Sequence, residues 1–341
     1  MESGVKDTRN QRTTKTGKAN QPRVTSADVA RASGVSRATV SYVLNNDPHQ
    51  SIPPETRERV RKAAQVLGYH PFTPARILST GQSQLVLAVL PFEQIDPALA
   101  GSLKALEARL AAQGLTLLCS FGEHLRTQTT HPSFNVTPSV ILSYADEADP
   151  TIAAFLQPFH VPVFPMMIHA TSQQAIGMMQ ANYLFEHGKH RLFFAASQRE
   201  DVHLLMHNRL LGVQQACAKV ALASPEVCTI PASRETTRAI LHDLFAGSTP
   251  PWGICCYNDE VAFAVIAALT DEGITIPEDA AVIGCDDIPL APFCTPPLTT
   301  IHFATEYTLD PLVALIIAAA HGEPVNEVPE TILSIIERKS V

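Results

Sequence analysis

The sequence predicts an α/β body of two similar lobes, preceded by a small all-helical headpiece. Short apolar runs alternate with longer amphipathic stretches from residue 85 onward, a pattern typical of parallel sheets covered by helices. This region of about 250 residues is long for one sheet, which favours two lobes with a cleft between them. Between Thr25 and Tyr69, by contrast, apolar residues recur at helical spacing. A headpiece of three or four short helices is therefore expected.

The composition permits a large core, because 45% of the 341 residues are hydrophobic and only 17% are charged. No run of about 18 apolar residues could span a membrane, and residues 1–20 lack the apolar stretch of an export leader. We therefore expect a cytoplasmic protein. The seven cysteines form no CxxC pair and have no clustered histidine partners. Reduced, buried cysteines are expected, with no metal and no other cofactor.

Changes in composition divide the chain into four segments. Residues 1–23 are rich in Thr, Gln, Asn and Lys and offer too little apolar surface to become ordered, so a disordered basic arm is expected. The headpiece occupies residues 24–70. Two prolines and a Gly/Gln/Ser stretch mark a hinge helix and linker at 71–84, and the two-lobed body occupies 85–341.

The elements of the body follow from the lengths of the apolar runs and from helix-ending glycines. Short apolar runs predict strands at Leu85–Leu90, Leu115–Cys119, Val140–Leu142, Val161–Phe164, Leu192–Ala195, Gly253–Tyr257 and Ala281–Cys285. Amphipathic stretches predict helices at Pro97–Gln113, Ser172–Glu186, Arg209–Ala221, Glu260–Glu272 and Tyr307–Ala320. Several of these helices are followed by glycine, which readily adopts the left-handed conformation after a last turn.

The charge is divided unevenly between the headpiece and the body. Residues 1–80 hold 13 Lys and Arg against 6 Asp and Glu, a net charge of +7, whereas the remainder holds 12 against 27, a net charge of −15. A basic module on an acidic body indicates a site for a polyanion such as nucleic acid. The alternative is a basic tail that is only solvated.

Residues 25–45 have the spacing of a helix-turn-helix. Thr25 supplies a capping oxygen for a first helix, a turn follows at Gly34, and Ser36 caps a second helix that runs to about Asn45. The outward stripe of this second helix consists of Arg37, Ala38, Ser41, Tyr42 and Asn45. A helix exposed in this way can enter the major groove of DNA. On spacing alone, an ordinary helical hairpin is the alternative.

Motifs in the headpiece and in the body carry a resemblance to a known family. They are Asp28-Val29-Ala30, Gly34-Val35-Ser36, Ala38-Thr39-Val40-Ser41, Val43-Leu44-Asn45, Glu55-Thr56-Arg57-Glu58-Arg59-Val60, Leu67-Gly68-Tyr69, Tyr257-Asn258-Asp259-Glu260, Ile283-Gly284-Cys285-Asp286-Asp287 and Pro297-Leu298-Thr299-Thr300. With them the chain resembles the LacI/GalR family of bacterial transcriptional regulators from Val24 to its end, most weakly between about Glu93 and His187. The resemblance implies a two-lobed body like that of periplasmic binding proteins.

The resemblance also implies a homodimer that binds a roughly palindromic operator in double-stranded DNA. By position, Arg37, Ala38 and Tyr42 would read bases, and Arg37 could donate a bidentate pair to guanine. The phosphate contacts would come from Ser36, Thr39, Ser41 and Asn45, although Thr39 could instead serve only the helix start. Tyr42 stands where relatives often have Arg, so the base read at that step does not transfer. Pro53 likewise replaces the usual Ser cap of the next helix.

The segment Thr73–Leu78 matches the family's hinge helix. It is far shorter than the roughly 12 to 15 residues that an isolated helix needs to persist in water, so we expect it to be frayed without DNA. In the resemblance, Leu78 occupies the position of the leucine that wedges into the central base step, and Arg76 is the nearby cation. The alternative is a plain linker leucine.

In the body, the resemblance assigns Arg209, Asn258 and Asp286 to the binding of a small effector. Three departures from the sugar-binding pattern occur at Asp96-Pro97-Ala98-Leu99, Met166-Met167 and Gln173-Gln174. They leave fewer stacking faces and fewer hydroxyl acceptors, so a simple sugar is disfavoured. Arg209 would still favour a carboxylate or phosphate on the ligand.

The leading hypothesis is a dimeric, sequence-specific DNA-binding regulator, expected to be a repressor, that is gated by a small molecule. One alternative is a ligand-binding protein of the same fold that has lost DNA regulation or effector control. Another is an enzyme, which is disfavoured because the sequence contains no Walker A, GxGxxG, GxSxG or HExxH motif.

Overall fold

The computed structural model describes residues 24–44, 50–69, 83–122, 137–145, 149–166, 170–325 and 332–341. The chain forms two compact units, residues 1–81 and 82–341. Several predictions fall outside the described residues, namely the basic arm at 1–23, most of the hinge and linker, Asn45, Arg76 and Leu78.

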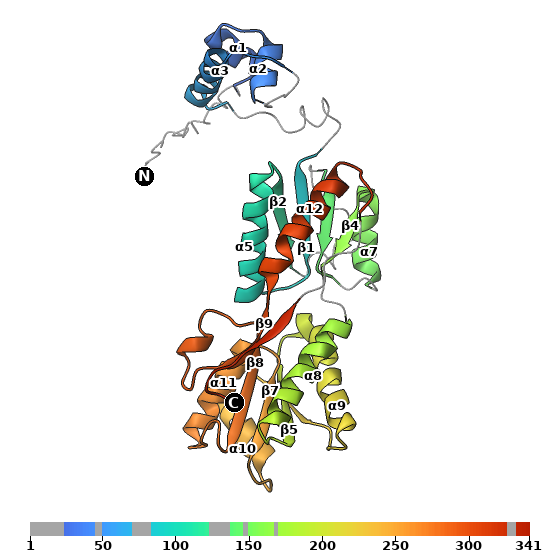
Figure 1. Cartoon of the computed structure of the whole chain (residues 1–341), viewed down its shortest axis with the longest axis vertical. Coiled ribbons are helices and arrows are strands. Elements are labelled where there is room, and N and C mark those ends of the chain that lie inside the picture. The colour runs from blue at the N-terminus through green and yellow to red at the C-terminus, as the bar shows by residue number, and fades with distance from the viewer. Residues whose placement is uncertain are drawn as a thin grey trace, which may run out of the picture. The chain divides into compact units, whose positions relative to one another are not determined.

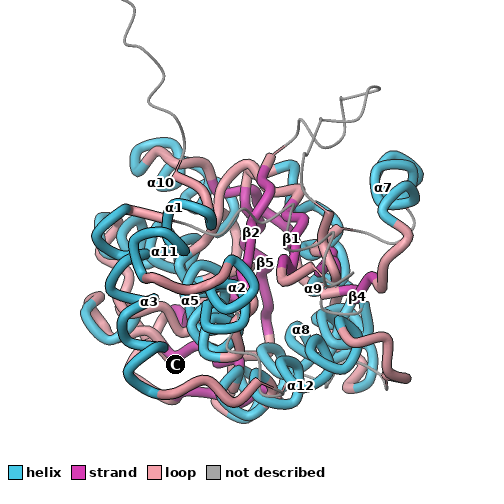
Figure 2. Tube along the Cα trace, turned by 90° about the horizontal axis from the view of Figure 1, so that it is seen from above, coloured by secondary structure: helices cyan, strands magenta, loops and turns pink. Residues whose placement is uncertain are grey.

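The described residues of the headpiece form three short helices, α1 (Ser26–Ser33), α2 (Arg37–Leu44) and α3 (Pro54–Leu67), seen in Figures 1 and 2. Their small core contains Val29, Val40, Val43 and Val60, each at most 1% exposed. The turn between α1 and α2 is made by Gly34 in the left-handed conformation, with φ of 67°. This arrangement confirms the helix-turn-helix that the spacing predicted.

The first lobe of the body is a four-stranded parallel sheet in the order β2-β1-β3-β4. Its strands are β1 (Leu85–Leu90), β2 (Thr116–Phe121), β3 (Val140–Ser143) and β4 (Val163–Pro165). Its helices are α5 (Pro97–Ala112), α7 (Pro150–Leu156) and α12 (Leu309–Ala320). Helices α5 and α12 pack with Val86, Ala88 and Leu90 on one face of the sheet, whereas α7 packs with Leu87 and Val89 on the other (Figure 1).

The second lobe is a six-stranded sheet in the order β10-β9-β8-β7-β5-β6. Its strands are β5 (Arg191–Ser197), β6 (Glu226–Ile230), β7 (Trp252–Cys256), β8 (Ala280–Cys285), β9 (Thr299–Phe303) and β10 (Leu333–Ile336). Its helices are α8 (Ala170–Glu186), α9 (His203–Lys219), α10 (Arg234–Phe245) and α11 (Asp259–Asp271). The chain enters this lobe after β4, returns to the first lobe to form α12, and ends in the second lobe with β10 (Figure 1).

The structure differs from the sequence prediction in the direction of one strand and in several elements that were not predicted. Strand β10 runs antiparallel to β9, so the second sheet is mixed rather than all parallel. Strands β6, β9 and β10 and helices α7 and α10 were not predicted from the sequence. Strand β6 is a half-exposed edge strand with three of its five residues exposed, and it therefore lacks a continuous apolar run. The predicted seven strands and five helices are otherwise present, with ends shifted by up to six residues.

None of the described helices is both long enough and apolar enough to cross a membrane.

Helices α8 and α9 lie side by side because each has a glycine where the other helix approaches. A Cβ atom on Gly177 would lie 1.9 Å from the Arg209 carbonyl oxygen, and one on Gly212 would lie 2.0 Å from the Gln174 carbonyl oxygen. Real side-chain carbons do not come this close to backbone atoms, so only glycine permits this distance between the helix axes. The same contact places Arg209 of α9 against the first turns of α8.

We predict that Gly212→Ala lowers the free energy of unfolding by about 2 to 3 kcal/mol, because the added methyl must push the two helices apart. The matched control is Gly101→Ala in α5, where nothing lies within 4 Å of the added carbon and helix propensity predicts a gain of up to about 1 kcal/mol. Urea unfolding followed by circular dichroism measures both. Equal stabilities for the two variants would contradict the steric account.

Candidate DNA-reading face and effector-binding site

The start of α2 fixes the exposed face of that helix. The Ser36 hydroxyl accepts a hydrogen bond from the Thr39 amide at 3.0 Å, and the two hydroxyl groups are hydrogen-bonded at 2.9 Å. The helix is thereby capped as the sequence predicted. Thr39 is only partly exposed, and its contact with Ser36 fits the alternative in which it serves the helix start.

The outward stripe of α2 lies opposite its buried valines. Arg37, Ala38, Ser41 and Tyr42 are exposed, Tyr42 to 37%, while Val40 and Val43 on the other side are 1% exposed. A cation, a methyl group, a hydroxyl and a phenol thus share one accessible face. These groups suit contacts with base edges and phosphates.

Helix α3 begins without a side-chain cap, because its N-cap residue is Pro53. Arg57 stabilises the preceding turn instead, since its guanidinium donates to the carbonyl oxygens of Ile52 and Gln50, both at 3.2 Å. Arg59 donates to the Ser33 carbonyl oxygen at 2.9 Å. The two arginines thereby tie α3 to neighbouring segments of the headpiece.

In the body, Arg209 is almost completely buried at 4% exposure. Its Nε donates to Gln173 Oε1 at 2.6 Å, and its Nη1 donates to the Tyr257 carbonyl oxygen. The guanidinium also lies over the Tyr257 ring, 4.6 Å from the ring centroid. Among the described residues, no carboxylate forms an ion pair with it within 4.0 Å. The contacts of this buried cation are therefore with neutral groups.

Asn258 and Asp286 follow strands β7 and β8, at the carboxyl edge of the second sheet. Asn258 is 6% exposed and caps α11, with Oδ1 accepting from the Val261 amide at 3.0 Å. Asp286 has a positive φ of 112°, and its amide donates to the Ile301 carbonyl oxygen at 2.8 Å. Burial raises the pKa of Asp286 to about 8, although the nearby Arg209 acts in the opposite direction.

The structure brings Arg209 and Asp286 within electrostatic range of each other and of Asp96 in the first lobe. Asp96 caps α5, with Oδ1 accepting from the Leu99 amide at 2.8 Å. Asp96 and Gln173 lie in segments that depart from the sugar-binding pattern, but no contact was predicted for either residue. The signal available was the position of each polar residue at the beginning of a predicted helix.

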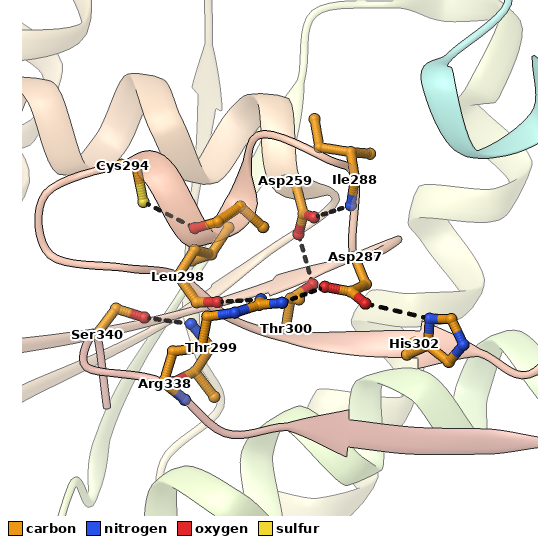
Figure 3. Close-up of polar contacts among 11 residues, drawn as sticks. Asp259, Asp287, Ile288, Cys294, Leu298, Thr299, Thr300, His302, Arg338 and Ser340 are labelled. Atoms are coloured by element: carbon orange, nitrogen blue, oxygen red, sulfur yellow. Dashed lines mark hydrogen bonds and ion pairs between the residues drawn. The ribbon is translucent and has the colours of Figure 1, made fainter. Parts of the chain in front are cut away.

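The carboxylates next to the candidate effector residues make hydrogen bonds with other parts of the body. Asp259 is fully buried and accepts from the Ile288 amide at 2.9 Å and from the Thr300 hydroxyl at 2.5 Å (Figure 3). Burial raises its pKa to about 6. A Cβ on Gly284 would lie 2.2 Å from Asp259 Oδ1, so the glycine makes room for this carboxylate.

Asp287 joins the end of β8 to the last residues of the chain. It accepts from the Arg338 guanidinium at 2.6 Å and lies 3.3 Å from Nδ1 of His302 (Figure 3). Ser340 continues this connection, since its hydroxyl accepts from the Thr299 amide at 2.8 Å and donates to the Val282 carbonyl oxygen at 2.6 Å. The loop that carries Asp286 is therefore held by hydrogen bonds to the C-terminal segment.

Among the described residues, no group of three or more His, Cys, Asp and Glu side chains could hold a metal ion. The paired Cys255 and Cys256 are fully buried in β7, and burial raises the pKa of both thiols. Such thiols are poor nucleophiles at neutral pH.

Comparison with known proteins gives two family matches. Residues 25–71 match the lacI family of bacterial regulatory proteins, and residues 181–341 match the periplasmic binding protein-like domain. The first match contains the helix-turn-helix, and the second contains Arg209, Asn258 and Asp286.

Curated relatives match most of the chain. The transcriptional regulator GalR of Lacticaseibacillus casei is 28% identical over 307 residues, which cover 83% of this chain and 88% of that protein. The transcriptional repressor CytR of Escherichia coli K12 is 28% identical over 299 residues, covering 83% and 86%. The transcriptional repressor PurR of Vibrio atlanticus is 27% identical over 290 residues, covering 81% and 85%.

Solved structures confirm the fold. The lac repressor dimer bound to operator and the anti-inducer ONPF aligns with a TM-score of 0.74 at 22% identity, covering 93% of this chain and 99% of that one. A LacI-family regulator from Silicibacter pomeroyi aligns with a TM-score of 0.72 at 22% identity, with the same coverage.

The raised pKa of Asp286 predicts how stability depends on pH. Because the folded protein keeps this proton up to about pH 8, whereas the unfolded chain loses it near pH 4, stability falls as the pH rises between these two values and levels off above pH 8. We expect Asp286→Asn, which stays neutral and tolerates a positive φ, to weaken this dependence. Melting temperatures between pH 6 and 9 test it, with exposed Asp243→Asn as control. The same pH dependence in all three proteins would refute the assignment.

Proposed function

We propose that this protein is a cytoplasmic repressor, because the chain belongs to the LacI/GalR family of bacterial transcriptional regulators. In this proposal it binds a palindromic operator as a homodimer and is gated by a small molecule. The observation that carries the proposal is the accessible face of α2, which is capped by Ser36 and backed by buried valines. This face lies within the part of the chain that matches the lacI family.

We assign base reading to Arg37, Ala38 and Tyr42. The Arg37 guanidinium can donate two hydrogen bonds to a guanine edge, Ala38 can contact a thymine methyl, and Tyr42 offers one hydroxyl and a ring edge. The phosphate contacts are assigned to Ser36, Thr39, Ser41 and Asn45. For the hinge we propose that Leu78 wedges into the central step with Arg76 beside it.

A homodimer is supported by two apolar side chains that follow β8. Leu290 is 62% exposed, and Phe293, in the short 3-10 helix Ala291–Phe293, is 80% exposed. Burying such side chains against the same surface of a second copy would remove apolar area from water. A twofold axis between the copies would repeat the recognition helices, so each operator would contain two half-sites.

We assign the binding of the effector to Arg209, Asn258 and Asp286. Burying a cation among neutral acceptors is costly, and an anionic ligand group would lower that cost. We therefore propose an effector that carries a carboxylate or a phosphate rather than a simple sugar.

A second candidate is a DNA-binding regulator that no longer responds to an effector. It is favoured by the hydrogen bonds of Arg209 to Gln173 and to the Tyr257 carbonyl oxygen, because these internal partners could replace a ligand. Screening small carboxylates and phosphates for an effect on operator binding separates the two candidates.

We expect purified protein to enrich a two-fold symmetric site from random duplex DNA at near-physiological salt. With that site as probe, Arg37→Ala should lose about 10- to 100-fold in affinity, because a bidentate contact to a base contributes roughly 1 to 3 kcal/mol of discrimination. Binding to unrelated DNA should weaken much less. Arg238→Ala, on the surface of α10, is the control and should bind normally. Failure to enrich any site would count against sequence-specific binding.

The dimer surface has its own test. Phe293→Glu should shift the protein toward monomer in sedimentation equilibrium, because a charge would have to be buried in the interface. Val66→Glu, which changes a residue of the headpiece that is 78% exposed, should leave the association constant unaltered. A dimer that is as stable with Phe293→Glu as without it would place the interface elsewhere.

A further inference from the structure

Arg199 and Asp201 form a close ion pair in the loop between β5 and α9. The guanidinium donates from Nε to Oδ1 at 3.0 Å and from Nη2 to Oδ2 at 2.7 Å. The side chains are only 21% and 9% exposed. Such a forked, partly buried pair is more strongly fixed than an exposed ion pair.

The same two side chains reach across to the first lobe. Asp201 Oδ2 accepts from the Glu93 amide at 2.9 Å, and Arg199 Nη2 donates to the Gln94 carbonyl oxygen at 2.8 Å. Residues 93 and 94 belong to the loop between β1 and α5. Together, Arg199, Asp201 and the backbone of residues 93 and 94 form what we call the clasp.

The clasp lies beside the proposed effector site. Arg199 and Arg209 both interact electrostatically with Asp96 and Tyr257. On either side of the clasp, Phe92 and Val202 are 8% and 4% exposed and belong to the same apolar cluster. Separating the lobes would therefore break the hydrogen bonds of the clasp.

We propose that the clasp holds the two lobes together across the cleft and sets the fraction of molecules that is open to an effector. The inference rests on the proposed function only in naming the effector, since every clasp contact is made by the chain itself. If only the open form admits the ligand, the apparent affinity falls in proportion to the open fraction. Arg199 and Asp201 are then positioning residues that control access to the site.

The electrostatics of the pair agree with this role. Burial acts to raise the pKa of Asp201, but the hydrogen bonds from Arg199 and from the Glu93 amide outweigh it, so that the pKa is lowered. The carboxylate is therefore ionised at neutral pH, when its attraction for both donors is greatest. Partial burial also limits screening of the pair by salt.

The test is a distance measurement on the full chain, with neither DNA nor effector present. Spin labels are placed at Ala100→Cys on α5 and Glu235→Cys on α10, both at exposed positions. The half-buried Cys119 and Cys294 are replaced by serine. Pulsed electron resonance then gives the distribution of distances between the lobes.

We expect Asp201→Asn to increase the population at longer distance at least tenfold. Arg199→Lys, which keeps the charge but loses the fork, should give a smaller increase. The matched control is Glu226→Gln, which removes the partner of Arg191 in an ion pair contained within the second lobe, and it should match the unmodified chain. Arg199→Ala serves as the second test if Asp201→Asn does not fold.

An unchanged distribution in Asp201→Asn and in Arg199→Ala, with both variants folded, would overturn the proposal. An equal increase of the long-distance population in Glu226→Gln would also overturn it, because loss of an ion pair outside the clasp would then have the same effect. Neither result bears on operator binding. Conversely, failure of the DNA selection would leave the distance measurement valid, so the two proposals can fail separately.

Discussion

The second lobe depends on the burial of one cation, Arg209. Removing a guanidinium from water costs on the order of several kcal/mol unless its hydrogen bonds are replaced. Replacement comes from Gln173, from the Tyr257 carbonyl oxygen and from the Tyr257 ring. Gln173 is within reach because Gly177 and Gly212 let α8 and α9 touch. A steric constraint between two helices thus determines the position of the charge that an effector would meet.

A second constraint is the backbone after β8, where Asp286 and Asp287 both have positive φ, 112° and 47°. Such conformations cost about 1 to 3 kcal/mol each and persist only where the surroundings determine them. Asp259 holds the next residue, Ile288, and Arg338 holds Asp287. The C-terminal segment therefore supports the loop that presents Asp286, although it lies more than 50 residues further along the chain.

Local features could be predicted from the sequence, whereas long-range polar contacts could not. The exposed face of α2 lies within one eight-residue helix, so periodicity and the Ser36 cap were enough to predict it. The buried strands β7 and β8 consist mainly of apolar residues and were also predicted. Strand β9 begins with Thr299 and Thr300, which are buried because Ser340, Arg338 and Asp259 bond with them. Those partners are about 40 residues away, and no local pattern indicates them.

The same distinction explains why only part of the candidate effector site was predicted. Arg209, Asn258 and Asp286 were assigned through family motifs, but Gln173 is 36 residues from Arg209 and the clasp joins residues 105 and 108 positions apart. Asp96 interacts with both Arg199 and Arg209, so an anionic group that approached Arg209 would also meet the charge of Asp96. Such a ligand can gain from Arg209 only if it carries a donor for Asp96 or if the lobes move apart. Moving the lobes apart requires breaking the clasp, and on these grounds ligand chemistry and lobe opening are coupled in this protein.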